Sequence, residues 1–185
     1  MSGYDALLAR REVEDSVADV FEAEFLVVTG RSVEIVGRGE SPDYEVLIDD
    51  VKTGLELTAI HAGDAETILA EMRSLAGKKG ASYRRRGLFI RPIILLGHLD
   101  WPAPDVEGAA LFDWHNELAD IAASAEFDCC GFSEVWLMDV GYKYSSRRDP
   151  RRPADFFCFG PNNVGFHQRE RKRVPYWSFA QDRFL

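Results

Sequence analysis

Two carboxylates on consecutive predicted strands are the residues of this sequence best placed to do chemistry. Asp43 directly precedes an apolar run at residues 44–48, and Glu56 lies early in a second run at residues 55–60. Both runs are rich in aliphatic and β-branched residues, and the polar segment 49–54 between them ends in glycine, which predicts a β-hairpin. Because paired strands lie about 5 Å apart, this hairpin can bring the two carboxylates together.

The oxygen atoms near these carboxylates are suited to a hard divalent cation. Side chains of one parity share a face of a strand, so Glu56 is expected to point with Thr58 and away from Leu57. The exposed carbonyl of Leu57 then adds a third oxygen beside Asp43 and Glu56. Mg²⁺ prefers oxygen ligands and keeps several of its waters, so these groups predict a magnesium site.

The order Pro42-Asp43, a strand, and Glu56-Leu57-Thr58 resembles the PD-(D/E)xK nuclease superfamily, which has the restriction-endonuclease-like fold. In that family the aspartate and the glutamate bind the metal ion, and a lysine two residues after the glutamate assists the attacking water. The resemblance implies that Asp43, Glu56 and the Leu57 carbonyl hold Mg²⁺ or Mn²⁺ and that the substrate is DNA. It covers roughly residues 12–140.

Thr58 stands where the family has its lysine, and a hydroxyl supplies no positive charge. Lys52 is predicted to lie in the hairpin turn and to point away from the carboxylates, and Lys78 and Lys79 are predicted at the far end of the following helix. No lysine is therefore expected to take the missing role. A degenerate, non-cleaving domain is accordingly an alternative to an active enzyme with Asp43, Glu56 and Thr58 in its site.

Both principal acidic residues also have a plain structural interpretation. Asp43 follows Pro42, and Pro-Asp pairs are common in turns. Glu56 is interpreted as an edge-strand charge, although glutamate is disfavoured between two leucines of a strand unless its face is solvated or functional.

A third acidic residue is expected on the first helix, predicted at residues 5–25. Glu14 borders the apolar stripe one turn before Val17 and Phe21, and the resemblance implies that a glutamate on this helix can reach the metal. Glu12 is nearly as good a candidate. For both residues a solvated glutamate on the helix surface is the favoured interpretation.

The charges are unevenly distributed along the chain. The net charge is −9, which argues against nonspecific coating of nucleic acid, but residues 1–71 carry −12 and residues 72–185 carry +3. Arginine clusters in the second half are candidates for phosphate contacts, with solvated loops as the alternative. The candidate arginines are Arg84, Arg85, Arg86, Arg147, Arg148, Arg151 and Arg152.

The predicted elements alternate between helix and strand. Asp64 is expected to cap the second helix and Gly77 to close it, with residues 80–86 as a basic loop. The predicted order is a helix at 5–25, a strand from 25–29 and 32–36, the hairpin at 44–60, a helix at 64–76, a buried strand at 93–96, a helix at 113–126, a strand at 135–140 and an edge strand at 155–159. This order predicts an α/β domain in which a mixed central sheet is flanked by helices in three layers.

Length and composition fit one globular domain over residues 1–185, with a core at about 5–140 and a basic, aromatic extension at about 141–185. No apolar run approaches the roughly 20 residues of a membrane span, and no signal peptide is visible. The three cysteines form neither a disulfide framework nor a zinc pattern, which favours the cytoplasm.

Three functions follow as expectations. The first is a metal-dependent nuclease acting on DNA, or a descendant that has lost cleavage. The second is a binding module of the same fold, which docks nucleic acid or a protein without metal. The third is a structural homodimer whose interface is formed by Tyr176, Trp177 and Phe179.

Overall fold

The computed structural model describes residues 3–61, 63–99, 117–122, 126–139 and 155–161. Their strands form one mixed sheet of six strands in the order β1-β2-β3-β4-β5-β6. β3, β4 and β5 are parallel, and the remaining neighbours are antiparallel. The strands are β1 (Val33–Arg38), β2 (Tyr44–Ile48), β3 (Val51–Ile60), β4 (Ile93–Leu99), β5 (Glu134–Asp139) and β6 (Asp155–Gly160). The predicted α/β class with a mixed central sheet is confirmed.

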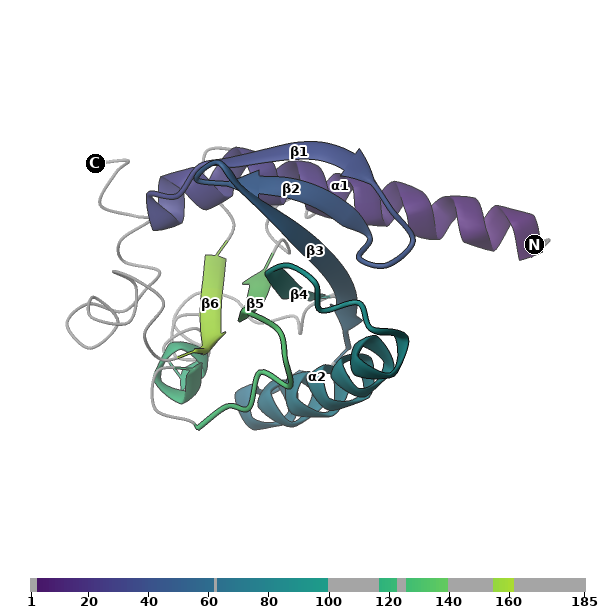
Figure 1. Cartoon of the computed structure of the whole chain (residues 1–185). Coiled ribbons are helices and arrows are strands. Elements are labelled where there is room, and N and C mark those ends of the chain that lie inside the picture. The colour runs from purple at the N-terminus through teal and green to yellow at the C-terminus, as the bar shows by residue number, and fades with distance from the viewer. Residues whose placement is uncertain (1–2, 62, 100–116, 123–125, 140–154, 162–185) are drawn as a thin grey trace, which may run out of the picture.

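Two long helices cover opposite faces of this sheet (Figure 1). On one face, α1 (Gly3–Thr29) packs the ring of Phe25 against Trp136 of β5, with ring centroids 5.3 Å apart. On the other face, α2 (Ala65–Arg86) places Met72 directly over Gly97 of β4, where an added Cβ would lie 2.5 Å from the Met72 sulfur. The central strand β4 is buried on both faces, since all seven of its residues are buried.

α1 continues through the segment predicted to begin the first strand. Val17, Phe21, Phe25 and Val28 are all buried, which extends one helical stripe to the end of the helix. Gly30, with φ of 75°, then ends the helix, because glycine adopts the left-handed region without steric cost. The predicted strand at residues 25–29 is therefore wrong, and the first strand is β1.

The β2–β3 hairpin has a two-residue turn, shorter than predicted. Asp49 and Asp50 both have positive φ, of 49° and 66°, which suits a tight hairpin turn. Residues 51–54 therefore belong to β3 and pair with β2. The last pair of the hairpin is Tyr44 with Leu55, so β3 runs on beyond β2 from Glu56 to Ile60 with only β4 beside it.

α2 is longer than predicted, and this difference decides the site. Asp64 caps the helix as expected, since its side chain accepts a hydrogen bond from the Thr67 amide at 2.8 Å. Gly77 does not end the helix, which continues to Arg86 and is capped by Gly87 with φ of 65°. The predicted loop at residues 80–86 is wrong, because the buried positions of the helix continue at its own spacing: Ala65, Ile68, Met72, Ala76, Gly80 and Tyr83.

The later elements agree with prediction where the structure describes them. β4 extends the predicted buried strand to Leu99, β5 matches the predicted strand closely, and β6 is the edge strand. Residues 117–122 are helical, within the predicted helix at 113–126. Residues 113–116 and 123–125 of that helix lie outside the described residues, as do residues 140–154 and 162–185, and Glu126 is not helical.

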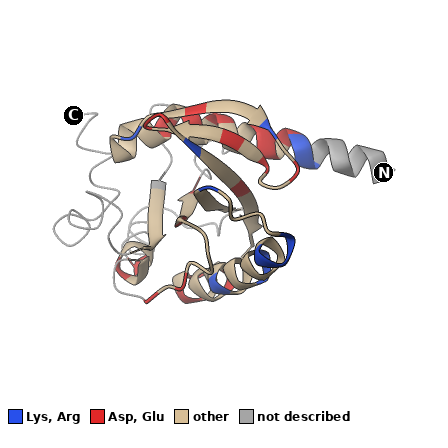
Figure 2. Ribbon diagram, in the orientation of Figure 1, with Lys and Arg blue, Asp and Glu red and all other residues tan. Residues whose placement is uncertain are grey.

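Acidic and basic residues are separated in space as they are in sequence. In Figure 2, acidic residues follow α1 and the β1–β3 strands, whereas Lys and Arg residues gather at the C-terminal end of α2. The last turn of α2 consists of Arg84, Arg85 and Arg86, a favourable place for positive charge because the helix dipole is negative at that end.

The two glycines of α2 give a test of its packing. Nothing lies within 4 Å of a Cβ added to Gly77, whereas a Cβ on Gly80 would lie 2.3 Å from the backbone oxygen of Cys130. Gly77→Ala should therefore raise the free energy of unfolding by about 0.5–1 kcal/mol through helix propensity. Gly80→Ala should lower it by about 1–3 kcal/mol, because the clash outweighs the same gain in propensity. Urea denaturation measures both, and equal effects of the two substitutions would contradict this packing.

Candidate functional site

The candidate site is a notch formed where β3 extends past the start of β2, bounded by Asp43, Glu56 and the Leu57 carbonyl. Backbone groups of Leu57 point toward the side that β2 has left open, so they need other partners. The side chain of Asp43 accepts the Leu57 amide at 2.8 Å. The structure thus brings together the start of β2 and the middle of β3, as the hairpin prediction required.

Glu56 is a buried carboxylate on a central strand. Its residue is 6% exposed, and β3 lies between β2 and β4, so the interpretation as an edge-strand charge is wrong. Burying a charge is unfavourable unless it is paired and hydrogen-bonded. Both of its oxygens are occupied: Lys79 Nζ lies 2.5 Å from Oε1, and the Tyr83 hydroxyl donates to Oε2.

Lys79 supplies a positive charge inside the notch, which the sequence-based prediction excluded. Its ammonium contacts Glu56 Oε1 and also donates to the Leu57 carbonyl at 3.2 Å. The sequence placed Lys79 away from the notch because the predicted helix ended at Gly77. With the helix intact, Lys79 follows Ala76 by one turn and precedes Tyr83 by one turn, so it lies beside the buried stripe. The continued spacing of Ala76, Gly80 and Tyr83 was the signal that could have revealed it.

Thr58 lies on β3 in the position that the resemblance assigns to a lysine. It is partly exposed, and within the described part of the chain its hydroxyl has no hydrogen-bond partner. Lys52 is also on β3, where it pairs with Glu45 at 3.0 Å and lies away from the notch.

The electrostatic environment raises the pKa of Asp43 to about 6. Burial is the main cause, because it disfavours the charged form, and the negative charge of Glu56 adds to it. The Leu57 amide and the Lys79 ammonium act in the opposite direction but do not cancel these effects. Asp43 and Glu56 are therefore close enough to interact as like charges.

Glu14 of α1 also faces this region, and its charge contributes to the raised pKa of Asp43. Its side chain is 14% exposed and binds Arg10 at 2.8 Å and Arg38 at 2.9 Å. The interpretation of Glu14 as a solvated surface residue is therefore wrong. Glu12 is exposed, as that interpretation expected, so the structure distinguishes between the two candidates.

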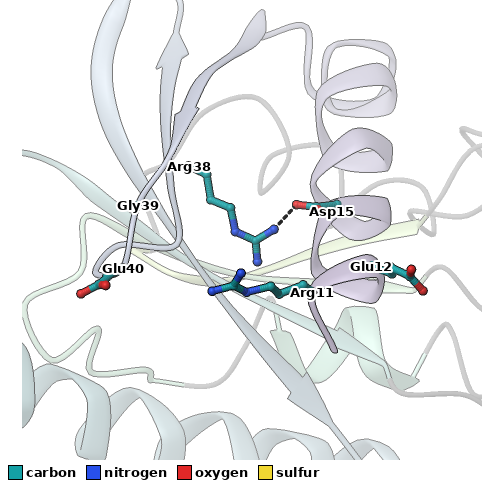
Figure 3. A pocket seen from close by; sticks show the side chains of 6 residues that line it. All are labelled: Arg11, Glu12, Asp15, Arg38, Gly39 and Glu40. Atoms are coloured by element: carbon teal, nitrogen blue, oxygen red, sulfur yellow. Dashed lines mark hydrogen bonds and ion pairs between the residues drawn. The ribbon is translucent and has the colours of Figure 1, made fainter. Parts of the chain in front are cut away.

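An open hollow of about 540 Å³ lies beside the notch, between α1 and the residues that follow β1 (Figure 3). Arg38 reaches across it to Asp15, while Arg11 extends into it. The backbone joins the hollow to the notch, because the Gly39 amide donates to the Asp43 carbonyl at 2.8 Å. The hollow is lined by Arg11, Glu12, Asp15, Arg38, Gly39 and Glu40. Three carboxylates and two guanidinium groups are among them, so the net charge of the hollow does not favour an anion.

The residues of the notch suit a hard cation, although few carboxylates are available. Among the described residues, no group of three or more His, Cys, Asp or Glu side chains is placed to hold a metal ion. Two carboxylates and one carbonyl remain, which fits Mg²⁺ if water completes its shell. The Lys79 ammonium already lies as a cation on two of these oxygens, from Glu56 and Leu57. Two of the three predicted ligands therefore share one cation, while the third, Asp43, binds the Leu57 amide.

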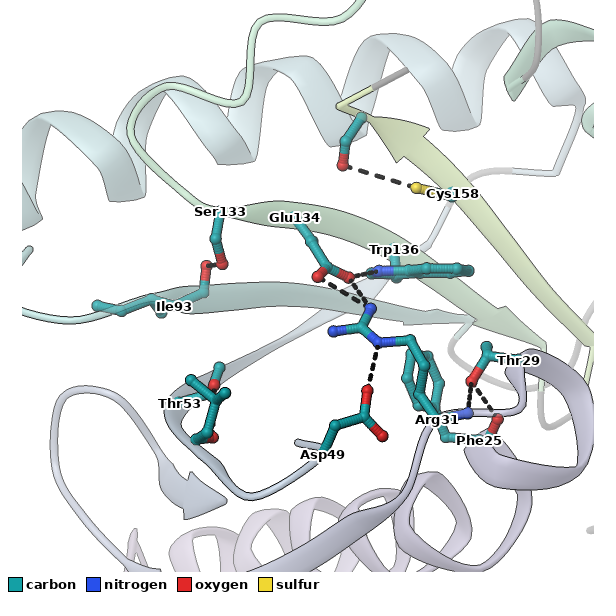
Figure 4. Close-up of polar contacts among 12 residues, drawn as sticks. Phe25, Thr29, Arg31, Asp49, Thr53, Ile93, Ser133, Glu134, Trp136 and Cys158 are labelled. Atoms are coloured by element: carbon teal, nitrogen blue, oxygen red, sulfur yellow. Dashed lines mark hydrogen bonds and ion pairs between the residues drawn. The ribbon is translucent and has the colours of Figure 1, made fainter. Parts of the chain in front are cut away.

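A second buried carboxylate shows what a purely structural ion pair looks like in this protein (Figure 4). Glu134 lies on the opposite face of the sheet from Glu56, and each of its oxygens accepts a hydrogen bond from Arg31 Nη1, at 2.8 and 2.9 Å. The Trp136 indole also donates to it at 2.7 Å, and the Arg31 guanidinium lies over the ring of Phe25. The two pairs are buried to a similar extent, since the side chains of Arg31 and Glu134 are 28% and 12% exposed and those of Lys79 and Glu56 are 26% and 8% exposed, so the pairs differ in their cation and not in their burial.

The predicted nucleic-acid contacts are only partly described. Arg84 donates to the Cys130 carbonyl and Arg86 donates to the Ser41 hydroxyl at 3.0 Å, so both have intramolecular roles. Arg85 is exposed and, among the described residues, has no partner. The other four candidates lie outside the described residues: Arg147, Arg148, Arg151 and Arg152.

Comparison with known proteins found no match: no family model, no curated protein and no solved structure resembles this chain. In the described part of the chain, neither helix has a stretch long and apolar enough to cross a membrane. The chemistry of the notch is therefore the basis for any functional proposal.

The raised pKa of Asp43 predicts a pH-dependent stability. Because the pKa in the folded protein is about 6 and the ordinary value is 3.8, the folded state binds this proton more tightly. The contribution of Asp43 to stability is thus greatest below pH 4 and falls as the pH rises through 6. Asp43→Asn removes this dependence, so its stability relative to wild type should increase by about 1–2 kcal/mol between pH 4 and pH 7, the partial exposure of the group limiting the effect.

Urea unfolding at several pH values measures this difference. Asp50→Asn is the control, because it removes a negative charge from an exposed position of the β2–β3 turn. A difference between Asp43→Asn and wild type that stays constant across this pH range would contradict the environment described for Asp43.

Proposed function

We propose that this protein is a Mg²⁺- or Mn²⁺-dependent phosphodiesterase acting on DNA, with a restriction-endonuclease-like fold resembling the PD-(D/E)xK nucleases. One observation carries the proposal: Lys79 Nζ lies 2.5 Å from Glu56 and 3.2 Å from the Leu57 carbonyl. The role that the family pattern gives to a lysine on β3, where this chain has Thr58, is assigned to a lysine from α2. Acidic ligands and a lysine then occur together, as they do in the family pattern.

Each residue of the notch has a proposed role. Asp43, Glu56 and the Leu57 carbonyl would hold the metal, and Glu14 would contact it through a water. When bound, the metal ion would lower the pKa of a water and stabilise charge on the phosphate. Because its pKa is about 6, Asp43 is mostly ionised at pH 7 and available as a ligand. Lys79, released from Glu56, would orient the attacking water and stabilise the negative charge that develops on the phosphate.

Cleavage of DNA tests this proposal. Wild-type protein should cleave plasmid or oligonucleotide DNA with Mg²⁺ or Mn²⁺, and Asp43→Ala and Glu56→Ala should abolish both cleavage and metal binding. Lys79→Ala should reduce the cleavage rate by about 100-fold or more, because it removes the positive charge beside the phosphate. Lys78→Ala is the matched control, because Lys78 is the exposed neighbour of Lys79 on the same helix. This variant should cleave DNA at the wild-type rate.

Urea unfolding of the two lysine variants separates a catalytic defect from a folding defect, because Lys79→Ala leaves Glu56 buried without its cation. Equal cleavage rates for Lys79→Ala and wild type would refute the assigned role of Lys79. No cleavage by wild type with either metal would refute the nuclease proposal.

A second candidate is a non-catalytic module of the same fold, and the Lys79–Glu56 ion pair also supports it. An ammonium that neutralises a buried carboxylate removes the need for a metal. The exposed Arg85, at the end of α2, is then available for a phosphate or an acidic protein. The aromatic residues suggested for a homodimer interface, Tyr176, Trp177 and Phe179, lie outside the described residues.

DNA binding without metal distinguishes this candidate from the enzyme. A binding module should shift labelled DNA in the presence of EDTA, and the shift should weaken steeply with salt because phosphate contacts release counterions. Arg85→Gln should weaken the shift, while Arg73→Gln, on the same helix but bonded to the Glu126 carbonyl at 2.8 Å, should leave DNA binding unchanged. Binding that requires Mg²⁺ or resists salt would exclude this module.

A further inference from the structure

Lys79 contacts one carboxylate oxygen of Glu56, and Tyr83 donates a hydrogen bond to the other. Tyr83 is 3% exposed, and its hydroxyl donates to Glu56 Oε2. Its ring packs against Phe89 and Phe132, with centroid separations of 5.4 and 5.6 Å, and these two rings also contact each other, so Tyr83 belongs to an aromatic cluster that holds its ring in place. A hydrogen bond from a rigid donor to one oxygen fixes the plane of the carboxylate and turns the other oxygen toward the notch.

The next turn of α2 is linked to the segment that carries the second acidic residue. Ser41 lies two residues before Asp43. Arg86, one turn beyond Tyr83 on α2, donates to the Ser41 hydroxyl at 3.0 Å. The last two turns of α2 therefore contact both sides of the notch, β3 at Glu56 and the segment before β2 at Ser41.

We infer that Tyr83 is a positioning residue that fixes the Glu56 carboxylate and that, with Arg86 on Ser41, it lets the end of α2 set the separation of the two acidic groups. Its effect on metal binding rests on the proposed function, whereas its effect on the geometry of the notch does not. Residues that orient metal ligands typically change metal affinity by 10–100-fold when removed. A purely structural tyrosine would contribute packing alone, and its ring would provide this without the hydroxyl.

Tyr83→Phe separates these two roles, because it deletes the hydroxyl and keeps the ring. The readout in metal-free protein is the Leu57 amide, which donates to Asp43 at 2.8 Å and so reports the position of the segment 41–43. In Tyr83→Phe the hydrogen exchange of the Leu57 amide should become at least about tenfold faster, relative to wild type, than the average change of the core amides. Comparison with the core amides corrects for any loss of global stability. Tyr44→Phe is the matched control, since its buried hydroxyl binds Asp15 at 2.5 Å and lies on the α1 side.

Calorimetric titration with Mn²⁺ measures the consequence. Tyr83→Phe should bind Mn²⁺ about 10–100-fold more weakly than wild type, with Tyr44→Phe close to wild type. Equal Mn²⁺ affinity of Tyr83→Phe and wild type, or a Leu57 amide that exchanges no faster than the core average, overturns the positioning role. If wild type itself binds no Mn²⁺, the proposed function fails, and the Leu57 amide alone then decides the role of Tyr83.

Discussion

The burial of Glu56 on a central strand is the constraint on which the rest of this site depends. A carboxylate that is 6% exposed requires a positive partner and hydrogen bonds to both oxygens. Lys79 and Tyr83 provide these, and they lie one turn apart on α2. The helix must therefore continue past Gly77 at least as far as Tyr83, and its close approach at Gly80, against the Cys130 backbone, lets both side chains reach β3.

The notch is also where the two electrostatic halves of the chain meet. Residues 1–71 carry −12 and supply Glu14, Asp43 and Glu56, whereas residues 72–185 carry +3 and supply Lys79. Acidic groups on the α1 side are matched locally, since Arg10 and Arg38 bind Glu14. The pKa of Asp43 is raised mainly by its burial and then by the charge of Glu56, and the Lys79 ammonium does not cancel these effects.

Two buried carboxylates of this protein differ in what surrounds them, and the difference bears on function. Each oxygen of Glu134 accepts a hydrogen bond from Arg31 Nη1, and the Trp136 indole donates a further one. Glu56 is paired instead with a lysine whose ammonium also donates to the Leu57 carbonyl. The two pairs are buried to a similar extent, so they differ in the cation, and an ammonium on a flexible stem changes its partner more readily than a planar guanidinium held by several hydrogen bonds.

The sequence by itself determined the alternation of elements, the hairpin that carries Asp43 and Glu56, the cap at Asp64 and the buried strand that became β4. These features depend on contacts between near neighbours in the chain, which periodicity and turn residues record directly. The ends of α1 and α2 depended on tertiary packing: Phe25 is helical because its ring meets Trp136, and Gly77 is helical because the residues on both sides of it pack against the sheet. Only the folded structure could place Lys79 beside Glu56, since 22 residues separate Lys79 from Leu57 and the pairing arises from how a helix lies across a sheet.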